Sequence, residues 1–334
     1  MLSRLRTAAA SPLWAVQLVT GAKSFEQNKL IGSRRLNEHG LHVRRVAAAH
    51  RLAAARRARL AHLVGDADRA AFDRDGYVVR RDFLPAGAFA ALRDEIAGFR
   101  GPIREKAEGR TILRKVTVGP AVLAAIPALR AVQDSPDWQG LCRYVGSRDI
   151  APAMYLQGVL QHAADGAEDP QTFLHADTFH PTVKAWLFLT DVLPDEGPFT
   201  YVPGSHRLTP ARLDWEGRMS LDAARSPDFE TRQGSFRIAE SGLSALGFPP
   251  PVAVAVPANT LVVADTFGFH ARGRSVRPSL RVEVWGIGQR NPFLPWTALD
   301  HAVGALGTVG RIDDPWDVRT GISMFERPAD AAAA

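Results

Sequence analysis

The chain has 334 residues, of which 46% are hydrophobic, enough for one large domain with extensions or for two small domains. Its single cysteine, Cys142, excludes an internal disulfide and a cysteine-based zinc site. The formal net charge of +6 is uneven: residues 1–65 hold twelve basic and two acidic residues, a net charge of +10, and the other 29 basic and 33 acidic residues give −4. No apolar run reaches the ~18 residues of a membrane span.

The first segment, residues 1–65, is predicted to be basic and partly helical. On a helix from Leu41 to Val64, one arc is basic and the opposite arc carries small apolar residues. The basic arc consists of Arg44, Arg45, Arg51, Arg56 and Arg59. Two interpretations stay open: a helix packed on the rest of the protein with a solvated arginine face, or a peripheral contact with an anionic membrane.

Under the membrane interpretation, Trp14, Leu18 and Phe25 would be apolar anchors. Residues 8–22 loosely imitate a signal peptide, but Pro12 and Gln17 interrupt the apolar stretch and no clear cleavage site follows. We therefore expect a cytoplasmic protein, peripheral at the membrane if the basic segment binds lipid. Nucleic acid is a weaker candidate for the arginines, because no known module or interleaved aromatic residues accompany them.

Residues 67–100 are predicted to form a helix, a strand and a second helix. The alternating run 77–84 follows a turn-forming Asp-Arg-Asp-Gly sequence. Pro85 then opens a helix in which Phe89, Leu92, Ile96 and Phe99 recur at helical spacing.

From residue 150 to 290 short apolar runs alternate with turn residues, which indicates strands. The clearest runs are 184–190, 199–202, 252–256, 260–264 and 280–287. Many short strands predict a mainly β fold with flanking helices and a core of antiparallel sheets, such as a double-stranded β-helix of the jelly-roll or cupin-like type.

Three parts are therefore expected: the basic segment 1–65, a β domain over 66–290, and a C-terminal extension over 291–334. Within the β domain, residues 207–250 are polar and predicted to be irregular. A stretch of this kind between barrel strands could be a lid over an active site.

The residues with the clearest chemical meaning are His175, Asp177 and His270. In an extended strand His175 and Asp177 point to the same face. His270 follows the run 260–264, and an antiparallel barrel could bring it beside the first pair. Two histidines and one carboxylate on one side of a metal form the facial triad of non-haem Fe(II) oxygenases, whose open positions take a 2-oxo acid and O₂.

Arg281 begins the apolar run 280–287 and could point into the barrel, where a buried guanidinium needs an anion. The distal carboxylate of 2-oxoglutarate would supply that anion through a two-bond fork. The alternative is an arginine on the outer face of the strand, paired with Glu283 or solvent. Arg272, Arg274 and Arg277 are rivals in a neighbouring loop.

Four stretches of this sequence together resemble the phytanoyl-CoA dioxygenase family over roughly residues 68–290. They are residues 72–84 with the helix that follows, His175-Ala176-Asp177 with 184–192, the run 196–206, and His270 with Arg281. The resemblance implies iron at His175, Asp177 and His270, and 2-oxoglutarate at Arg281. Related halogenases replace the carboxylate by a small residue, so Asp177 favours hydroxylation.

The implied activity is a dioxygenase that uses Fe(II), 2-oxoglutarate and O₂ to hydroxylate an unactivated C–H bond of a small-molecule or lipid-type substrate, releasing succinate and CO₂. Lys184, Trp186, Gln157 and Thr266 are further candidates for contacts with 2-oxoglutarate or substrate. His206, His180 and His162 are expected to be structural or peripheral to the metal. The alternative function is a non-catalytic metal-binding barrel that acts as a sensor or binding module.

Overall fold

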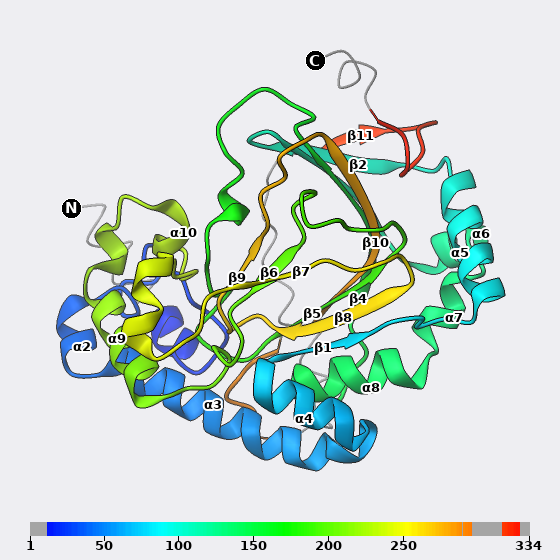
Figure 1. The fold of residues 1–334 in the computed structure, drawn as a ribbon. Coiled ribbons are helices and arrows are strands. Elements are labelled where there is room, and N and C mark those ends of the chain that lie inside the picture. The colour runs from blue at the N-terminus through cyan, green and yellow to red at the C-terminus, as the bar shows by residue number, and fades with distance from the viewer. Residues whose placement is uncertain (1–11, 289, 296–315, 328–334) are drawn as a thin grey trace.

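Two antiparallel sheets that face each other form the centre of the molecule (Figure 1). The structure is a computed structural model and describes residues 12–288, 290–295 and 316–327. The strands are β1 (Tyr77–Arg80), β2 (Ile103–Glu108), β3 (Thr111–Thr117), β4 (Ala153–Gln161), β5 (Val183–Phe188), β6 (Phe199–Tyr201), β7 (Val252–Val254), β8 (Thr260–Asp265), β9 (His270–Arg272), β10 (Ser279–Gly288) and β11 (Asp317–Arg319). The helices are α2 (Arg34–Glu38), α3 (Leu41–Leu60), α4 (Asp66–Asp75), α5 (Ala86–Gly98), α6 (Pro120–Ala125), α7 (Leu129–Gln133), α8 (Pro136–Val145), α9 (Pro210–Asp222) and α10 (Phe229–Arg232).

The large sheet has the order β1-β8-β5-β10-β4-β3-β2-β11, and β7-β6-β9 form the small one. Strand β10 lies between β4 and β5, so that Glu283 is opposite Gln157 and Phe188, and Trp285 is opposite Tyr155 and Trp186. Directly opposite residues point to the same side of a sheet. This side, called the inner face here, packs against the small sheet, because Trp186 and Phe188 share an apolar cluster with residues of β6 and β7.

The other side of the large sheet is covered by helices. Val282 and Val284 of β10 share one apolar cluster with Trp138 of α8, Leu92 of α5 and Phe72 of α4. These residues alternate with the inner-face residues of the same strand, as the period of two requires. Helices α4 and α8 lie below the sheet in the view of Figure 1, and α5, α6 and α7 lie at its right-hand end.

The predicted fold class, mainly β with flanking helices, is confirmed, although β1 and β7 leave the two sheets unjoined along one side. The five runs predicted as strands correspond to β5, β6, β7, β8 and β10, and the run after residue 76 becomes β1. That strand ends early, because Asp82 has a φ of 50° and residue 83 bonds to Asn259. Strands β2 and β3 and helices α6, α7 and α8 were not predicted.

The basic N-terminal segment packs on the rest of the protein. Arg45 and Arg56 of α3 are 6% and 1% exposed, so the expectation that both belong to a solvated arginine face is wrong. Arg56 donates to the carbonyls of Ser147, Pro292 and Leu294. Arginine suits this position because its planar fork satisfies several acceptors without a carboxylate.

Residues 207–250, predicted to be irregular, contain α9 and α10 and pack against α2 and α3 (Figure 1). The reason is a buried charge network that the polar sequence concealed. Arg212 and Glu216, one helical turn apart on α9, form an ion pair at 3.0 Å with side chains 0% and 2% exposed. His42 of α3 lies 2.9 Å from the other oxygen of Glu216. Burial raises the pKa of Glu216, but Arg212 and His42 outweigh burial and hold that pKa below its usual value.

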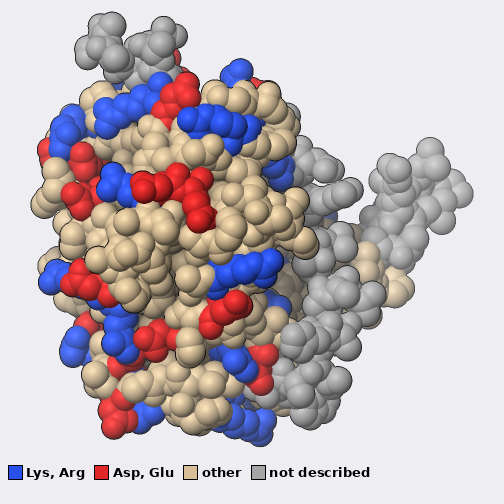
Figure 2. Space-filling model, turned by 90° about the vertical axis from the view of Figure 1, so that its right-hand side faces the viewer, with Lys and Arg blue, Asp and Glu red and all other residues tan. Residues whose placement is uncertain are grey.

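The structure describes only parts of the two ends of the chain for which the sequence made predictions. The signal-like stretch 8–22 and the extension 291–334 lie partly outside them. Met324 of that extension is fully buried in the core beneath the large sheet. No helix among the described residues is long and apolar enough to cross a membrane. The face on which α5, α6 and α7 lie carries basic and acidic side chains interspersed (Figure 2).

Replacement of Arg212 tests the network that joins α3 to α9. Arg212→Met should lower the free energy of unfolding by about 3–5 kcal/mol, because it leaves Glu216 buried without its main partner. Chemical denaturation followed by circular dichroism measures the change. Arg218→Met, at an exposed position of the same helix, is the matched control and should stay within about 0.5 kcal/mol of the parent protein. If the Arg212 variant is as stable as this control, the buried network does not stabilise the packing of α9 on α3.

Candidate metal centre

His175 and Asp177 lie on an extended segment that pairs with β9. The amide of His175 donates to the carbonyl of His270, and the amide of His270 donates to that of His175, both at 3.0 Å. This pairing places both imidazoles on the same side, with ring centroids 4.5 Å apart. Ala176, between the ligands in sequence, packs in an apolar cluster with Leu174. The predicted alternation of the His-X-Asp segment is thus what the structure shows.

The three side chains present ligand atoms that all lie within 4.8 Å of one another. One oxygen of Asp177, Oδ1, is 3.7 Å from Nε2 of His175 and 3.6 Å from Nε2 of His270. Each Nδ1 faces a main-chain carbonyl, that of Phe173 at 2.8 Å and that of Gly268 at 2.9 Å. Each Nδ1 therefore carries the proton, and each Nε2 directs a lone pair at the centre of the site.

The environment of these groups fits a divalent metal ion. Nε2 of His270 is buried and has no hydrogen-bond partner among the described residues. Burial lowers the pKa of His270 to about 3, so the ring is neutral at pH 7 and able to bind a metal. Burial raises the pKa of Asp177, but Lys184 and the two histidines outweigh it and hold the pKa well below its usual value. A carboxylate and two imidazoles directed at one common point suit Fe(II).

Two lysines converge on Asp177 from different parts of the chain. Nζ of Lys184, on β5, is 2.7 Å from Oδ2, the carboxylate oxygen that faces away from the histidines. Nζ of Lys23, in the N-terminal segment, donates to the main-chain carbonyl of Asp177 at 2.5 Å. Burial lowers the pKa of Lys23, and Asp177 partly offsets that effect. Lys184 thus orients the carboxylate so that Oδ1 faces the metal position.

The segment that carries the ligands has a second neighbour in residues 235–238. The amide of Ala176 donates to the carbonyl of Phe236, and the amide of Ile238 donates to that of Leu174. Ser235 adds a side-chain bond to the carbonyl of Ala176. The stretch 207–250 therefore forms one wall of the site, hydrogen-bonded to the main chain of the ligand segment. Its role as a lid stays a prediction.

Arg281 lies on the inner face of β10 and is buried, whereas the alternative placed it on the outer face; the pairing with Glu283 that the alternative included is present. Its Nε is 2.9 Å from a carboxylate oxygen of Glu283, and its Nη1 donates to the carbonyl of Gly197 at 3.0 Å. Gln157 donates to Glu283 as well. Burial lowers the pKa of Arg281. Within the described part of the chain, no hydrogen bond or ion pair occupies Nη2 of Arg281.

The rival arginines have partners elsewhere. Arg272 pairs with Asp169, Arg274 with Glu168, and Arg277 with Asp195. The side chains of Arg274 and Arg277 are 63% and 45% exposed, which leaves Arg281 as the most buried of these guanidinium groups.

The remaining predicted residues divide between the inner face and its surroundings. Trp186 packs on Phe199 with ring centroids 4.6 Å apart. The hydroxyl of Thr266 bonds to Thr182, and its carbonyl accepts the amide of Asp177 at 2.9 Å, so Thr266 contacts the main chain of a ligand. Gln157 lies beside Glu283 on the inner face.

None of the three additional histidines belongs to the ligand cluster. His180 is buried and bonds to the carbonyl of Pro181. His206 packs on Phe72, and His162 bonds to the carbonyl of Ser275.

Sequence reasoning missed Lys23 and Lys115 as parts of this interior, and it considered Glu283 only as a partner of Arg281 on the outer face of the strand. Lys115 faces Gln157 across β3 and β4, with its ammonium 4.2 Å from the centre of the Trp285 ring. Burial lowers the pKa of Lys115 to about 8. Had β3 been predicted, the alternation of side chains along it would have placed Lys115 on the inner face. Lys23 had no motif to reveal it.

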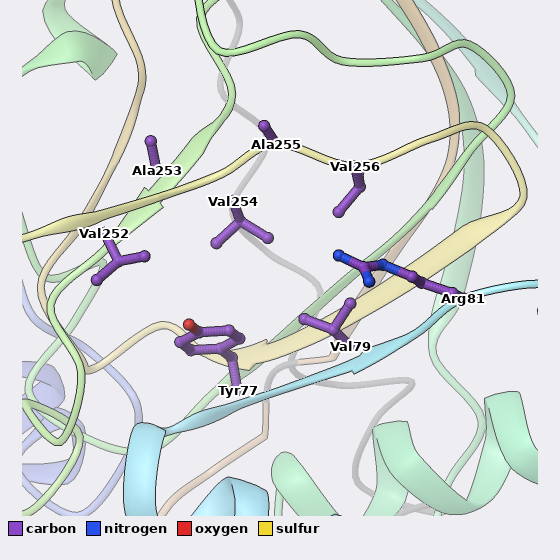
Figure 3. A pocket seen from close by; sticks show the side chains of 8 residues that line it. All are labelled: Tyr77, Val79, Arg81, Val252, Ala253, Val254, Ala255 and Val256. Carbon is purple, nitrogen blue, oxygen red and sulfur yellow. The ribbon is translucent and has the colours of Figure 1, made fainter.

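A cavity of about 530 Å³ lies at the side where the sheets are unjoined, and the three ligands do not line it. Its walls are Tyr77, Val79 and Arg81 on one side and residues 252–256 on the other, as Figure 3 shows. Tyr77 stacks edge-on against Tyr201, whose ring is 6.5 Å from that of His270. The cavity is thus separated from the triad by a layer of aromatic side chains.

Comparison with known proteins finds one matching family model and several similar solved structures. The family model described as "Phytanoyl-CoA dioxygenase (PhyH)" matches residues 72–234. No curated protein matches. Similar solved structures include the epimerase SnoN in complex with Fe³⁺, α-ketoglutarate and nogalamycin RO, which is 21% identical over 79% of this chain and 95% of that chain, with a TM-score of 0.45.

HygX from Streptomyces hygroscopicus, with nickel and 2-oxoglutarate bound, is 18% identical over 67% of this chain and 87% of that chain, with a TM-score of 0.43. The carbocyclase SnoK from nogalamycin biosynthesis is 19% identical over 77% and 97% of the two chains, with a TM-score of 0.42. Similarity at this level assigns neither a reaction nor a substrate to this chain. The family match does identify one part of the chain: residues 72–234 match the phytanoyl-CoA dioxygenase family.

Proposed function

We propose that the protein is a dioxygenase that hydroxylates an unactivated C–H bond of a small-molecule or lipid-type substrate, with release of succinate and CO₂. The observation that carries the proposal is the cluster of His175, Asp177 and His270, with both Nε2 atoms and one carboxylate oxygen directed at a common point. The carboxylate favours hydroxylation over halogenation, because it occupies the position that a halide would need on the metal.

Bound Fe(II) would supply the activation of O₂ together with 2-oxoglutarate. The residues of the chain would set the geometry. His175 and His270 offer their Nε2 atoms because their Nδ1 protons are held by carbonyls, and Asp177 offers Oδ1 because Lys184 holds Oδ2. The aromatic side chains around Trp186 would exclude water from the reacting bond.

For 2-oxoglutarate we propose that the distal carboxylate binds Arg281. The support is its burial on the inner face and an Nη2 that no described residue occupies. Glu283 already neutralises part of this charge, so an incoming carboxylate must share Arg281 with it. Gln157 and Trp186 stay proposed neighbours of 2-oxoglutarate or substrate. Thr266 is proposed to act through the main chain of Asp177.

A binding module or sensor with the same metal ligands is the rival function. It would bind Fe(II) and 2-oxoglutarate without consuming the latter. Slow formation of succinate in the absence of any other substrate distinguishes an enzyme from such a module, because oxygenases of this type turn over 2-oxoglutarate uncoupled from substrate oxidation.

We also propose that the N-terminal segment contacts an anionic membrane peripherally. Leu13, Val16 and Val19 are 59%, 61% and 61% exposed at helical spacing, which is unusual for large apolar side chains. They, and not the buried Phe25, are the apolar groups available to a bilayer. Charge for the contact would come from exposed arginines of α3, such as Arg44 and Arg51.

The metal assignment predicts the behaviour of two variants. His270→Ala and Asp177→Ala should each abolish Fe(II) binding and the visible charge-transfer band that forms when 2-oxoglutarate chelates Fe(II) under anaerobic conditions. His206→Ala, at a histidine outside the cluster, is the control and should keep the band. Iron bound by the parent protein without a band on addition of 2-oxoglutarate would exclude the proposed mechanism.

The anchoring assignment predicts a loss of affinity. Arg281→Ala should weaken 2-oxoglutarate binding by about 2–4 kcal/mol, roughly 30- to 1,000-fold, in the same anaerobic titration. Because that change also leaves Glu283 unpaired, Arg281→Met combined with Glu283→Gln is the matched control for stability and should bind 2-oxoglutarate equally weakly. Unchanged affinity in both variants would assign the anchoring role to another inner-face cation, Lys115 or Lys184.

The membrane contact is tested with the full chain. Replacement of Val16 and Val19 by Asp should at least halve sedimentation with vesicles that contain phosphatidylserine, since it removes apolar area and adds negative charge. Vesicles of phosphatidylcholine alone are the control for charge dependence. If the variant and the parent protein sediment equally with anionic vesicles at low salt, this segment is not the membrane contact.

A further inference from the structure

The ammonium of Lys23 reaches the main chain of Asp177 from 154 positions away in the sequence. It donates to the carbonyl of Asp177 at 2.5 Å. On the other side of the same residue, the amide of Asp177 donates to the carbonyl of Thr266 at 2.9 Å. The backbone of the only carboxylate in the triad is therefore held at both its amide and its carbonyl, once by the residue that follows β8 and once by the N-terminal segment.

The position of Lys23 is determined by the helix that follows it. Arg45 of α3 donates through Nε to the carbonyl of Leu18 and through Nη2 to those of Thr20 and Ala22. The same guanidinium lies 4.3 Å from the centre of the Phe179 ring, two residues after Asp177. Arg45 thus holds the chain immediately before Lys23 and packs against the chain immediately after the ligand.

The chain after Lys23 is also fixed, through contacts of Phe25. The amide of Phe25 donates to the carbonyl of Arg232 at 2.9 Å, and its buried ring stacks on Phe236 at 5.4 Å. Gly234, which has a φ of +83°, lies against the main chain of Lys23. A Cβ at position 234 would be 2.3 Å from the carbonyl oxygen of Lys23. Lys23 is therefore set between fixed points at residues 22 and 25.

These contacts connect Lys23 to the wall of the metal site. Phe236, which stacks on Phe25, accepts the amide of Ala176. Three parts of the chain thus pack one on the next: the N-terminal segment on the stretch 207–250, and that stretch on the segment that carries the ligands. Because metal ligands must be held within roughly 0.5 Å of their productive position, a donor on the main chain of a ligand is expected to affect metal affinity.

We propose that Lys23 is a positioning residue for the metal carboxylate, and that residues 18–25 complete the metal site from outside the β domain. The inference rests on the proposed function in one respect, that Asp177 binds the metal. Lys23 holds the peptide of Asp177 and Lys184 orients its side chain, so the two lysines restrict different motions of one ligand.

The test measures binding of Co(II), used alone as the probe, through its visible d–d absorption in the full-length protein. Lys23→Met should weaken Co(II) binding by about 10- to 100-fold and change the shape of the absorption, as loss of a supporting contact around a metal ligand does. Lys23→Arg, which keeps a cationic donor, should recover most of the affinity. Lys29→Met is the matched control, because Lys29 is exposed in the same segment and, among the residues that the structure describes, donates only to the carbonyl of Glu26.

A melting curve followed by circular dichroism separates positioning from stability. If Lys23→Met unfolds, Lys23→Gln, which keeps a shorter donor, replaces it in the same titration, and weaker binding with a native melting curve supports the proposal. Co(II) affinity and absorption equal to those of the parent protein in a folded Lys23 variant would overturn it. If the parent protein binds no Co(II), the proposed function is overturned as well. Failure of the Lys23 proposal alone is thus distinguished from failure of the metal site.

Discussion

The pair of main-chain hydrogen bonds between His175 and His270 is the contact on which the geometry of the site depends. It joins the ligand segment to β9 in antiparallel register, and the register alone places both imidazoles on the same side. A slip of one residue would turn one ring away from the other, because alternate residues of a strand point to opposite faces. Strand β6 supports this register from the other side, where Tyr201 is opposite His270 and bonds through its hydroxyl to the carbonyl of Asp265.

The two buried carboxylates of the interior, Asp177 and Glu283, each have cationic or polar partners. Asp177 has Lys184 on its free oxygen, and Glu283 has Arg281 and Gln157. A buried charge without a partner would cost several kcal/mol, so these pairs allow the interior between the sheets to keep a polar region beside its aromatic one.

The sequence predicted those features that depend on local pattern. Apolar alternation indicated β5, β8 and β10, and the spacing of His175 and Asp177 indicated a shared face, because both follow from a period of two along one strand. The inner position of Arg281 was among the alternatives for the same reason. The proximity of Lys23 to Asp177 depends instead on how three layers of the fold stack, and no local pattern encodes a contact over that separation. The charge network of α9 was hidden in a similar way, since Arg212 and Glu216 are ordinary surface residues by composition.

The N-terminal segment shows why net charge is a poor guide to the role of a region. Its charge of +10 suggested a basic arm directed at an anionic surface. In the folded protein Arg45 and Arg56 are buried donors to carbonyls, and Arg57 pairs with Asp265 of β8. These arginines act as multidentate hydrogen-bond donors where the chain offers carbonyl groups that no secondary structure satisfies. Only the remaining exposed cations are available to a membrane, so the segment is first a structural part of the enzyme, and any attraction to lipid is added on its outer side.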